Sequence, residues 1–170
     1  MNTILQRLQG RDRRSIGKSN QVVGAVLAQP DLFGALFEGM LNYDPVVRMR
    51  AADAVEKITA RHPEYLWPFK RRLIHEVAHV NQQEVRWHVA QMFSRVDLTP
   101  KERRAVFTIL LGYLDDRSRI VKTFSMQALA DLAMHDSNLR HTVVPLLKSL
   151  VRTGSPAMKT RGRKLLAMLS

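Results

Sequence analysis

The chain has 170 residues and a hydrophobic content of 45%, which suffice for one domain with an apolar core. It contains no cysteine, which excludes disulfides, thiolate metal sites and cysteine nucleophiles. No apolar run is long enough to cross a membrane, and a net charge of +12 favours anionic partners. We therefore expect a single cytoplasmic domain over residues 1–170, with no membrane association and no secretion signal.

The positive charge is concentrated at the two ends of the sequence. Residues 1–30 contain five Lys or Arg and one Asp, and residues 137–170 contain seven Lys or Arg and no acidic residue. Residues 31–136 are nearly neutral. We expect the two basic ends to attract an acidic partner by long-range electrostatics.

The first predicted elements are a basic N-terminal segment and a capping helix. The basic segment is residues 1–14, with a short helix at 2–9 and a loop that starts at Gly10. The capping helix is expected over 15–30, with Ser15 as its N-cap.

Residues 17–19, Gly-Lys-Ser, match the end of a phosphate-binding loop. Asp12 stands where such a loop has its first glycine, and an aspartate would repel a phosphate. No apolar strand precedes the motif, so we interpret the stretch as a helix N-terminus. Its cations either contact an acidic partner or stay solvated. The candidate residues are Arg11, Arg13, Arg14 and Lys18.

The remaining sequence, residues 31–170, divides into eight amphipathic helices. Asp44 and Ser155 are each followed by proline and are predicted N-caps, and Thr99 with Glu102 forms a capping box. No alternating pattern predicts a strand. The predicted ranges are 31–42, 45–61, 64–79, 82–96, 100–114, 118–135, 138–152 and 156–169.

An apolar residue followed by a cation recurs near the start of four of these helices. The cations are 38, 36 and 37 residues apart, and apolar positions in the preceding helices keep the same offsets. Such a period is typical of repeat proteins built from helix–turn–helix units. The cations either line a binding strip or pack structurally with their heads on turn carboxylates such as Asp44 and Asp116, and we favour the structural role. This basic ladder consists of Arg48, Arg86, Lys122 and Lys159.

The first copy, Asp44-Pro-Val-Val-Arg48-x-x-Ala51-Ala52-x-Ala54-Val55-x-x-Ile58, resembles a HEAT repeat. The resemblance covers nearly all of residues 31–170. It departs from the pattern at Gln82, where a capping Asp is missing, and at Gly162 and Arg163, which replace core residues. The resemblance implies an all-α fold, a right-handed α-solenoid of about four to five HEAT-like helical hairpins, of which residues 31–170 form four. HEAT arrays are mostly non-enzymatic scaffolds, and a minority bind nucleic acid, including HEAT-like glycosylases that remove alkylated bases from DNA.

Residues 75–79 read His-Glu-x-x-His, the pattern of a zinc hydrolase. On one continuous helix, His75 and His79 would share a face, and Glu76 would be the general base. No third ligand follows at the spacing of the extended zinc motifs, and the stretch falls on core positions of the repeat. We therefore expect two histidines on the flank of a packed helix, without a metal site or cofactor, and leave incidental metal affinity open.

By the same resemblance, the outward face of the second helix of each hairpin lines a concave surface. Trp87 is its one large aromatic residue, and with His88 and Gln91 it is predicted to form the central partner contact. A packing role for a partly buried Trp87 is the alternative. Trp67 is expected to pack at a repeat junction. The other residues predicted on this surface are Met49, Asp53, Glu56, Ser94, Thr123, Gln127, Ala130, Thr160, Lys164 and Ala167.

These features predict a non-enzymatic helical-repeat scaffold whose partner is an acidic macromolecule, with a protein preferred over nucleic acid. The alternatives are a nucleic-acid-binding HEAT-like protein, including one that recognises DNA lesions, and a zinc hydrolase. No catalytic residue and no small-molecule substrate are predicted. The predicted partner-binding residues are Trp87, His88, Gln91, Arg13, Arg14, Lys18, Arg161 and Lys164.

Overall fold

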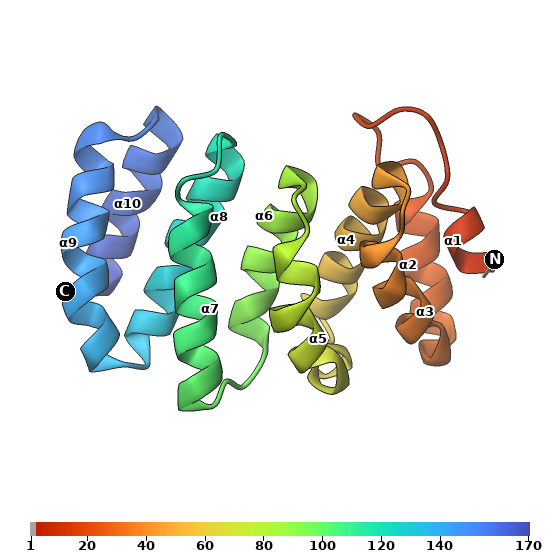
Figure 1. Cartoon of the computed structure of the whole chain (residues 1–170), viewed down its shortest axis with the longest axis horizontal. Coiled ribbons are helices and arrows are strands. Elements are labelled where there is room, and N and C mark those ends of the chain that lie inside the picture. The colour runs from red at the N-terminus through yellow and green to blue at the C-terminus, as the bar shows by residue number, and fades with distance from the viewer. Residues whose placement is uncertain (1–2) are drawn as a thin grey trace. The chain divides into compact units, whose positions relative to one another are not determined.

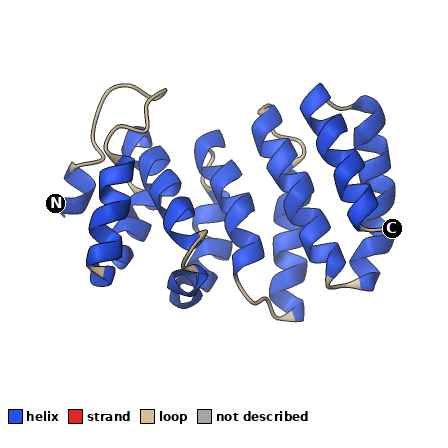
Figure 2. Ribbon diagram, turned by 180° about the vertical axis from the view of Figure 1, so that it is seen from behind, coloured by secondary structure: helices blue, strands red, loops and turns tan. Residues whose placement is uncertain are grey.

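The computed structural model describes residues 3–170, and all regular secondary structure in this range is helical (Figures 1 and 2). The predicted all-α class is confirmed. No helix among these residues has the length and apolar character to span a membrane. The α-helices are α1 (Thr3–Gln6), α2 (Ser19–Ala28), α3 (Phe33–Glu38), α4 (Pro45–Thr59), α5 (Lys70–His75), α6 (Gln83–Met92), α7 (Pro100–Tyr113), α8 (Arg119–Met134), α9 (Ser137–Thr153) and α10 (Pro156–Met168).

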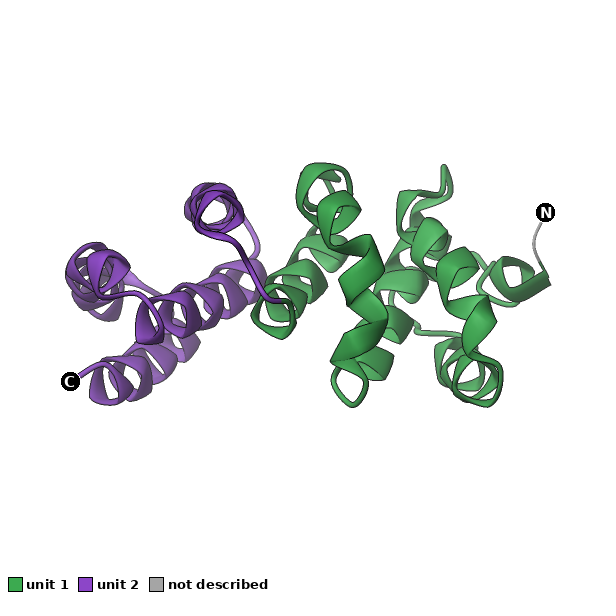
Figure 3. Cartoon of the chain, turned by 90° about the horizontal axis from the view of Figure 1, so that it is seen from below, with its two compact units in different colours: residues 1–96 green, residues 97–170 purple. Residues whose placement is uncertain are grey.

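The chain divides into two compact units, residues 1–96 and residues 97–170 (Figure 3). In the first unit, α4 packs against α2, α3 and α6. In the second unit, α8 packs against α7, α9 and α10, and α9 packs against α10. Each unit therefore has a central helix, α4 or α8, around which its neighbours bury their apolar faces.

The apolar positions that recur along the sequence lie in these cores. Leu36, Ile74, Leu110 and Leu147 are fully buried, and so are Ala51, Val89 and Ser125. Three positions of the pattern are only half-buried, namely Leu114, Val151 and Leu166. The sequence period therefore predicts burial well, because residues three to four apart share one face of a helix.

Side-chain caps begin three of the helices at the expected residues. Asp44 accepts a hydrogen bond from the N–H of Val46, and Ser155 accepts one from the N–H of Met158. The predicted capping box of α7 is confirmed, with both hydrogen bonds present. Gln82 caps nothing, and its side chain instead bridges two helices, donating to the carbonyl of Pro45 and accepting from Arg48.

Two predicted helices are interrupted. The stretch predicted at 64–79 is a 3-10 helix at Pro63–Phe69, then α5, then a 3-10 turn at Val77–His79. Pro68 has no N–H for a regular α-helix, and Glu76 leaves helical geometry with φ −121° and ψ −66°. The stretch predicted at 31–42 likewise consists of α3 flanked by the 3-10 turns Pro30–Leu32 and Gly39–Leu41.

The start of the capping helix was predicted wrongly. Ser15 is not its N-cap, because the Ser15 hydroxyl accepts from the N–H of Gly17 and α2 begins only at Ser19. Gly17 has a φ of +54°, a left-handed conformation that a helix cannot continue through. Residue 2, the predicted start of the first helix, lies outside the described residues.

Candidate binding sites

The N-terminal loop between α1 and α2 is organised around Arg50, a residue of α4. Its guanidinium donates four hydrogen bonds to backbone carbonyls, those of Leu8 (3.0 Å), Gln9 (2.8 Å), Asp12 (3.1 Å) and Ser15 (3.0 Å). Only 5% of Arg50 is exposed. Because a guanidinium has five N–H donors in a rigid fork, one side chain can hold four separated points of a loop.

Two glycines make room for this arginine. A Cβ at Gly10 would lie 2.5 Å from a nitrogen of the Arg50 guanidinium, and a Cβ at Gly17 would lie 2.6 Å from its central carbon. Both distances are shorter than any normal contact. The loop therefore closes around Arg50 only because these two positions have no side chain.

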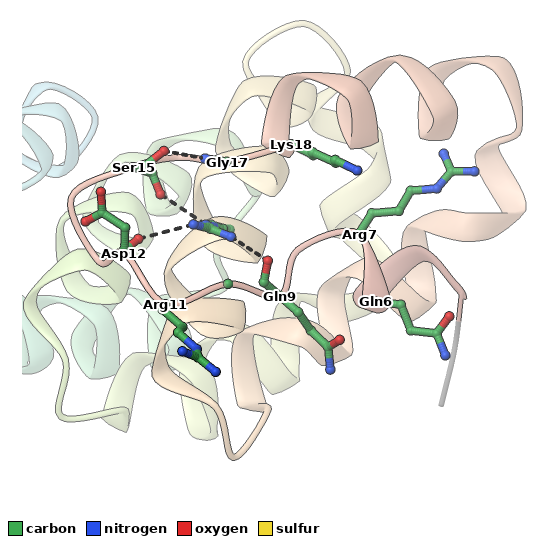
Figure 4. Close-up of a pocket in the computed structure, with 10 residues that line it drawn as sticks. Gln6, Arg7, Gln9, Arg11, Asp12, Ser15, Gly17 and Lys18 are labelled. Carbon is green, nitrogen blue, oxygen red and sulfur yellow. Dashed lines mark hydrogen bonds between the residues drawn. The ribbon is translucent and has the colours of Figure 1, made fainter.

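The loop encloses one side of a cavity of about 500 Å³ (Figure 4). The cavity lining contains four cations, one carboxylate and two glutamines, and no aromatic or aliphatic side chain. Figure 4 shows the side chains of Arg7 and Lys18 extending to the same side of the loop. The lining residues are Gln6, Arg7, Gln9, Gly10, Arg11, Asp12, Ser15, Gly17, Lys18 and Arg50.

The cations of this loop are exposed and largely uncompensated. Within the described residues, the predicted binding residues Arg13 and Lys18 have no carboxylate partner, and Arg14 pairs only loosely with Asp12, 3.6 Å away. Asp12 also accepts a hydrogen bond from the N–H of Arg14 at 2.8 Å. The single acidic residue of the loop is therefore directed to Arg14, and the positive potential of the other cations remains.

At the C-terminal end, the cations lie on the regular helices α9 and α10. Lys164 and Arg163 are exposed. Arg161, also predicted to bind a partner, is half-buried and donates to the Gln127 side chain of α8 at 2.6 Å. The structure thus places Arg161 in the packing between α10 and α8, and leaves Lys164 free to meet solvent.

The central trio lies on α6 and is less accessible than the sequence suggested. Trp87 is half-buried with its ring edge-on to that of His88, at a centroid distance of 5.7 Å. Gln91 donates to the carbonyl of Trp87 at 3.2 Å. Burial lowers the pKa of His88, and its Nδ1 is buried without a hydrogen-bond partner. The trio is contiguous, but only part of it faces solvent.

The acidic residues predicted beside this trio are engaged in packing. Asp53 is buried and accepts from the Ser19 hydroxyl at 2.5 Å and from the Lys57 amine at 2.7 Å. Glu56 accepts from Arg95 at 2.6 Å. The predicted outward positions Met49, Asp53 and Ala130 are therefore corrected to buried positions.

The His-Glu-x-x-His stretch does not lie on one continuous helix. α5 ends at His75, and Glu76 is held by Arg72, whose hydrogen bond lowers the pKa of the Glu76 carboxyl. Both histidines are exposed. Among residues 3–170, no three His, Asp or Glu side chains are grouped as metal ligands would be.

The basic ladder differs from its prediction at the first member. Arg48 donates to the carbonyls of Asn42 (2.8 Å) and Tyr43 (3.1 Å) and to the Gln82 side chain (2.8 Å), rather than to the carboxylate of Asp44. The other members, Arg86, Lys122 and Lys159, are half-buried.

Two aromatic residues, Trp67 and Tyr43, are largely exposed. Trp67 has 57% of its surface exposed and Tyr43 has 83%. Trp67 therefore does not pack into a junction, contrary to expectation.

Comparisons of the chain with protein-family models, curated proteins and solved structures give no match. The sites are therefore interpreted from their own geometry.

Proposed function

We propose that this protein is a non-enzymatic helical-repeat scaffold that binds an acidic macromolecular partner, a protein in preference to a nucleic acid. The observation that carries the proposal is the pairing of its cations. Cations in the middle of the sequence include members of half-buried ion pairs, such as Arg95 with Glu56 and Arg103 with Asp136. The exposed cations of the N-terminal loop and of α9 and α10 are in excess over carboxylates, so they are available to an external acid.

The scaffold is proposed to consist of HEAT-like helical hairpins. Two observations support this assignment. Most of the recurrent apolar positions are buried in both units, and side chains 34 residues apart bond in each unit: Arg48 with Gln82 in the first, and Arg161 with Gln127 in the second. Bonds at a constant separation are expected where one repeat stacks on the next.

The test measures binding of a fluorescent poly-glutamate peptide to the full chain and to charge-reversal variants. Arg13→Glu with Arg14→Glu changes the N-terminal loop, and Arg163→Glu with Lys164→Glu changes α10. The matched control reverses Arg117 and Arg119, which are equally exposed but lie in the nearly neutral middle of the sequence. We expect each terminal variant to weaken binding about tenfold or more and the control to weaken it less. Equal losses in all three would contradict the proposal.

Nucleic-acid binding is the alternative that the same experiment decides. A short DNA duplex and a single-stranded RNA are titrated in parallel across salt concentrations. Several phosphate contacts produce a steep linear fall of log affinity with log salt. Tight, steeply salt-dependent binding of either nucleic acid, with no binding of the acidic peptide, would replace the protein partner with nucleic acid.

A cross-linked pull-down tests the proposed central contact. The captured set from the intact protein is compared with that from Trp87→Ala. The half-buried ring of Trp87 is the largest side chain of the trio, and its loss is expected to remove the main captured partner. If the captured set is unchanged, binding does not involve the trio, and the basic ends alone remain as the binding surfaces.

A further inference from the structure

We propose that the cavity of the N-terminal loop is a binding site for the phosphate groups of a small polyphosphate ligand. This site goes beyond the proposed scaffold function, because its ligand is a small anion and its walls are formed by the end of α1, one loop and α4. It also gives a role to the Gly-Lys-Ser motif, which helix capping does not explain.

The cavity has an excess of positive charge. Arg7, Arg11 and Lys18 line the cavity as exposed cations, and Arg50 lies buried beside them. All four partners of Arg50 are neutral carbonyl oxygens, so its positive charge is solvated by dipoles and not cancelled by a carboxylate. A buried charge without a counter-ion is costly, and an anion in the adjacent cavity would offset that cost.

The site is already built before any ligand binds. Arg50 holds the loop at four carbonyls, and the absence of a Cβ at Gly10 and Gly17 allows that approach. Helix α2 begins directly after Lys18, which makes no side-chain cap to its first turn. The N-terminus of a ten-residue helix thus adds its positive dipole end beside the cations. A preorganised site loses little conformational entropy on binding.

The contacts of Asp12 reduce the repulsion that its carboxylate would exert on a phosphate. Its carboxylate accepts from the N–H of Arg14 and faces the guanidinium of Arg14, a residue that does not line the cavity, so its charge is partly balanced. Only its backbone carbonyl is bonded to Arg50. The aspartate therefore shapes the loop through its main chain.

The lining also restricts the class of ligand. A volume of about 500 Å³ accommodates more than a single phosphate. No aromatic or aliphatic side chain lines the cavity, so no aromatic ring offers a stacking surface for a nucleobase. The recognised chemistry is therefore the polyphosphate itself, whether it is free pyrophosphate or the phosphates of a nucleotide.

The experiment is calorimetric titration of the full chain in metal-free, low-salt buffer with four probes: inorganic pyrophosphate, sulfate, ADP and adenosine. Pyrophosphate and ADP are expected to bind with similar affinity, and adenosine is expected not to bind. Preference for ADP by more than about tenfold would mean that the base is recognised and would overturn the site as described. Sulfate that binds as tightly as pyrophosphate would also overturn it.

Arg7→Ala and Lys18→Ala locate the site, because both side chains are exposed and leave Arg50 in place. Each is expected to weaken pyrophosphate binding about tenfold, the loss typical of one charge-assisted contact. Arg152→Ala, an exposed cation of α9, removes the same charge elsewhere and is expected to change the affinity less than about twofold. No pyrophosphate binding by the unaltered protein, or equal effects of all three variants, would refute the site. The acidic-peptide result would be unaffected by that failure.

Discussion

The two basic ends of this protein present similar charges on different architectures. The N-terminal cations are on an irregular loop that closes around Arg50 and borders a cavity. The C-terminal cations are on two regular helices, α9 and α10, whose packing involves Gly162 and Arg161. A loop folded over a buried cation forms a concave site with fixed geometry. Cations on a helix surface form a diffuse field that attracts partners without selecting their shape.

The comparison also shows how differently the two ends are stabilised. The loop depends on one side chain that comes from 35 to 42 residues further along the sequence, whereas α9 and α10 have their own caps and a shared apolar face. Substitutions that affect either the Arg50 contacts of the loop or the helix packing of the second unit therefore test this difference directly.

Arg50→Ala is expected to have the largest effect. It removes four hydrogen bonds from a charged donor, so the loop must open for water to hydrate the four carbonyls. The free energy of unfolding is expected to fall by about 3 kcal/mol. Urea denaturation measures the loss, and trypsin is expected to cleave the loop at Arg11 or Arg13 much faster. Unchanged cleavage would show that the loop does not depend on Arg50.

Two glycine substitutions in the second unit are expected to have opposite signs. A Cβ at Gly162 would lie 2.5 Å from the Val151 Cγ2 and 3.1 Å from the Met126 Cε, so Gly162→Ala is expected to destabilise by about 2 kcal/mol. A Cβ at Gly112 meets nothing within 4 Å, so Gly112→Ala is expected to stabilise α7 by about 0.5 kcal/mol. Thermal denaturation of both variants is the measurement. A stabilising Gly162→Ala would mean that α9 and α10 are not closely packed.

A smaller effect, confined to acidic pH, is expected from His88. Burial lowers its pKa below the ordinary value of 6.5. The positive charges of Lys57 and Arg95 also lower the pKa, whereas the negative charges of Asp53 and Glu56 raise it. As the pH falls below 6.5, the unfolded chain takes up this proton first, so folding stability falls with pH.

Urea denaturation between pH 7.5 and pH 5 measures this dependence. Replacing His88 by Gln is expected to flatten it. The matched control replaces His135, which is exposed on the second unit, and is expected to keep the slope of the unaltered chain. An unchanged slope in the His88 variant would show that another group titrates.

The smallest effect is expected from Arg14→Ala. The Arg14 side chain is 94% exposed and its carboxylate partner is 56% exposed, so their attraction is screened by water. No measurable change in the urea midpoint is expected, in contrast to Arg50→Ala. A large loss of stability from Arg14→Ala would show that the loop is held by its own ion pair rather than by Arg50.

The sequence by itself determined the helical class, most helix ends and the core. These depend on local rules: residues three to four apart share a helix face, and Asp44, Thr99 and Ser155 cap the groups next to them. The helix predictions that were wrong also have local causes. Pro68 and Gly17 interrupt helices whose apolar spacing alone seemed continuous.

Only the tertiary structure decided which cations form a site. Arg50 stands among core residues of α4, and nothing in its neighbourhood along the chain predicts four carbonyl partners about 40 residues earlier. The one sequence feature that pointed to this site was the pair Gly10 and Gly17. Why both are glycine is apparent only from the structure, in which the Arg50 guanidinium leaves no room for a Cβ at either position. Helix formation is encoded by neighbours in sequence, whereas the solvation of a buried charge depends on whichever dipoles the fold brings to it.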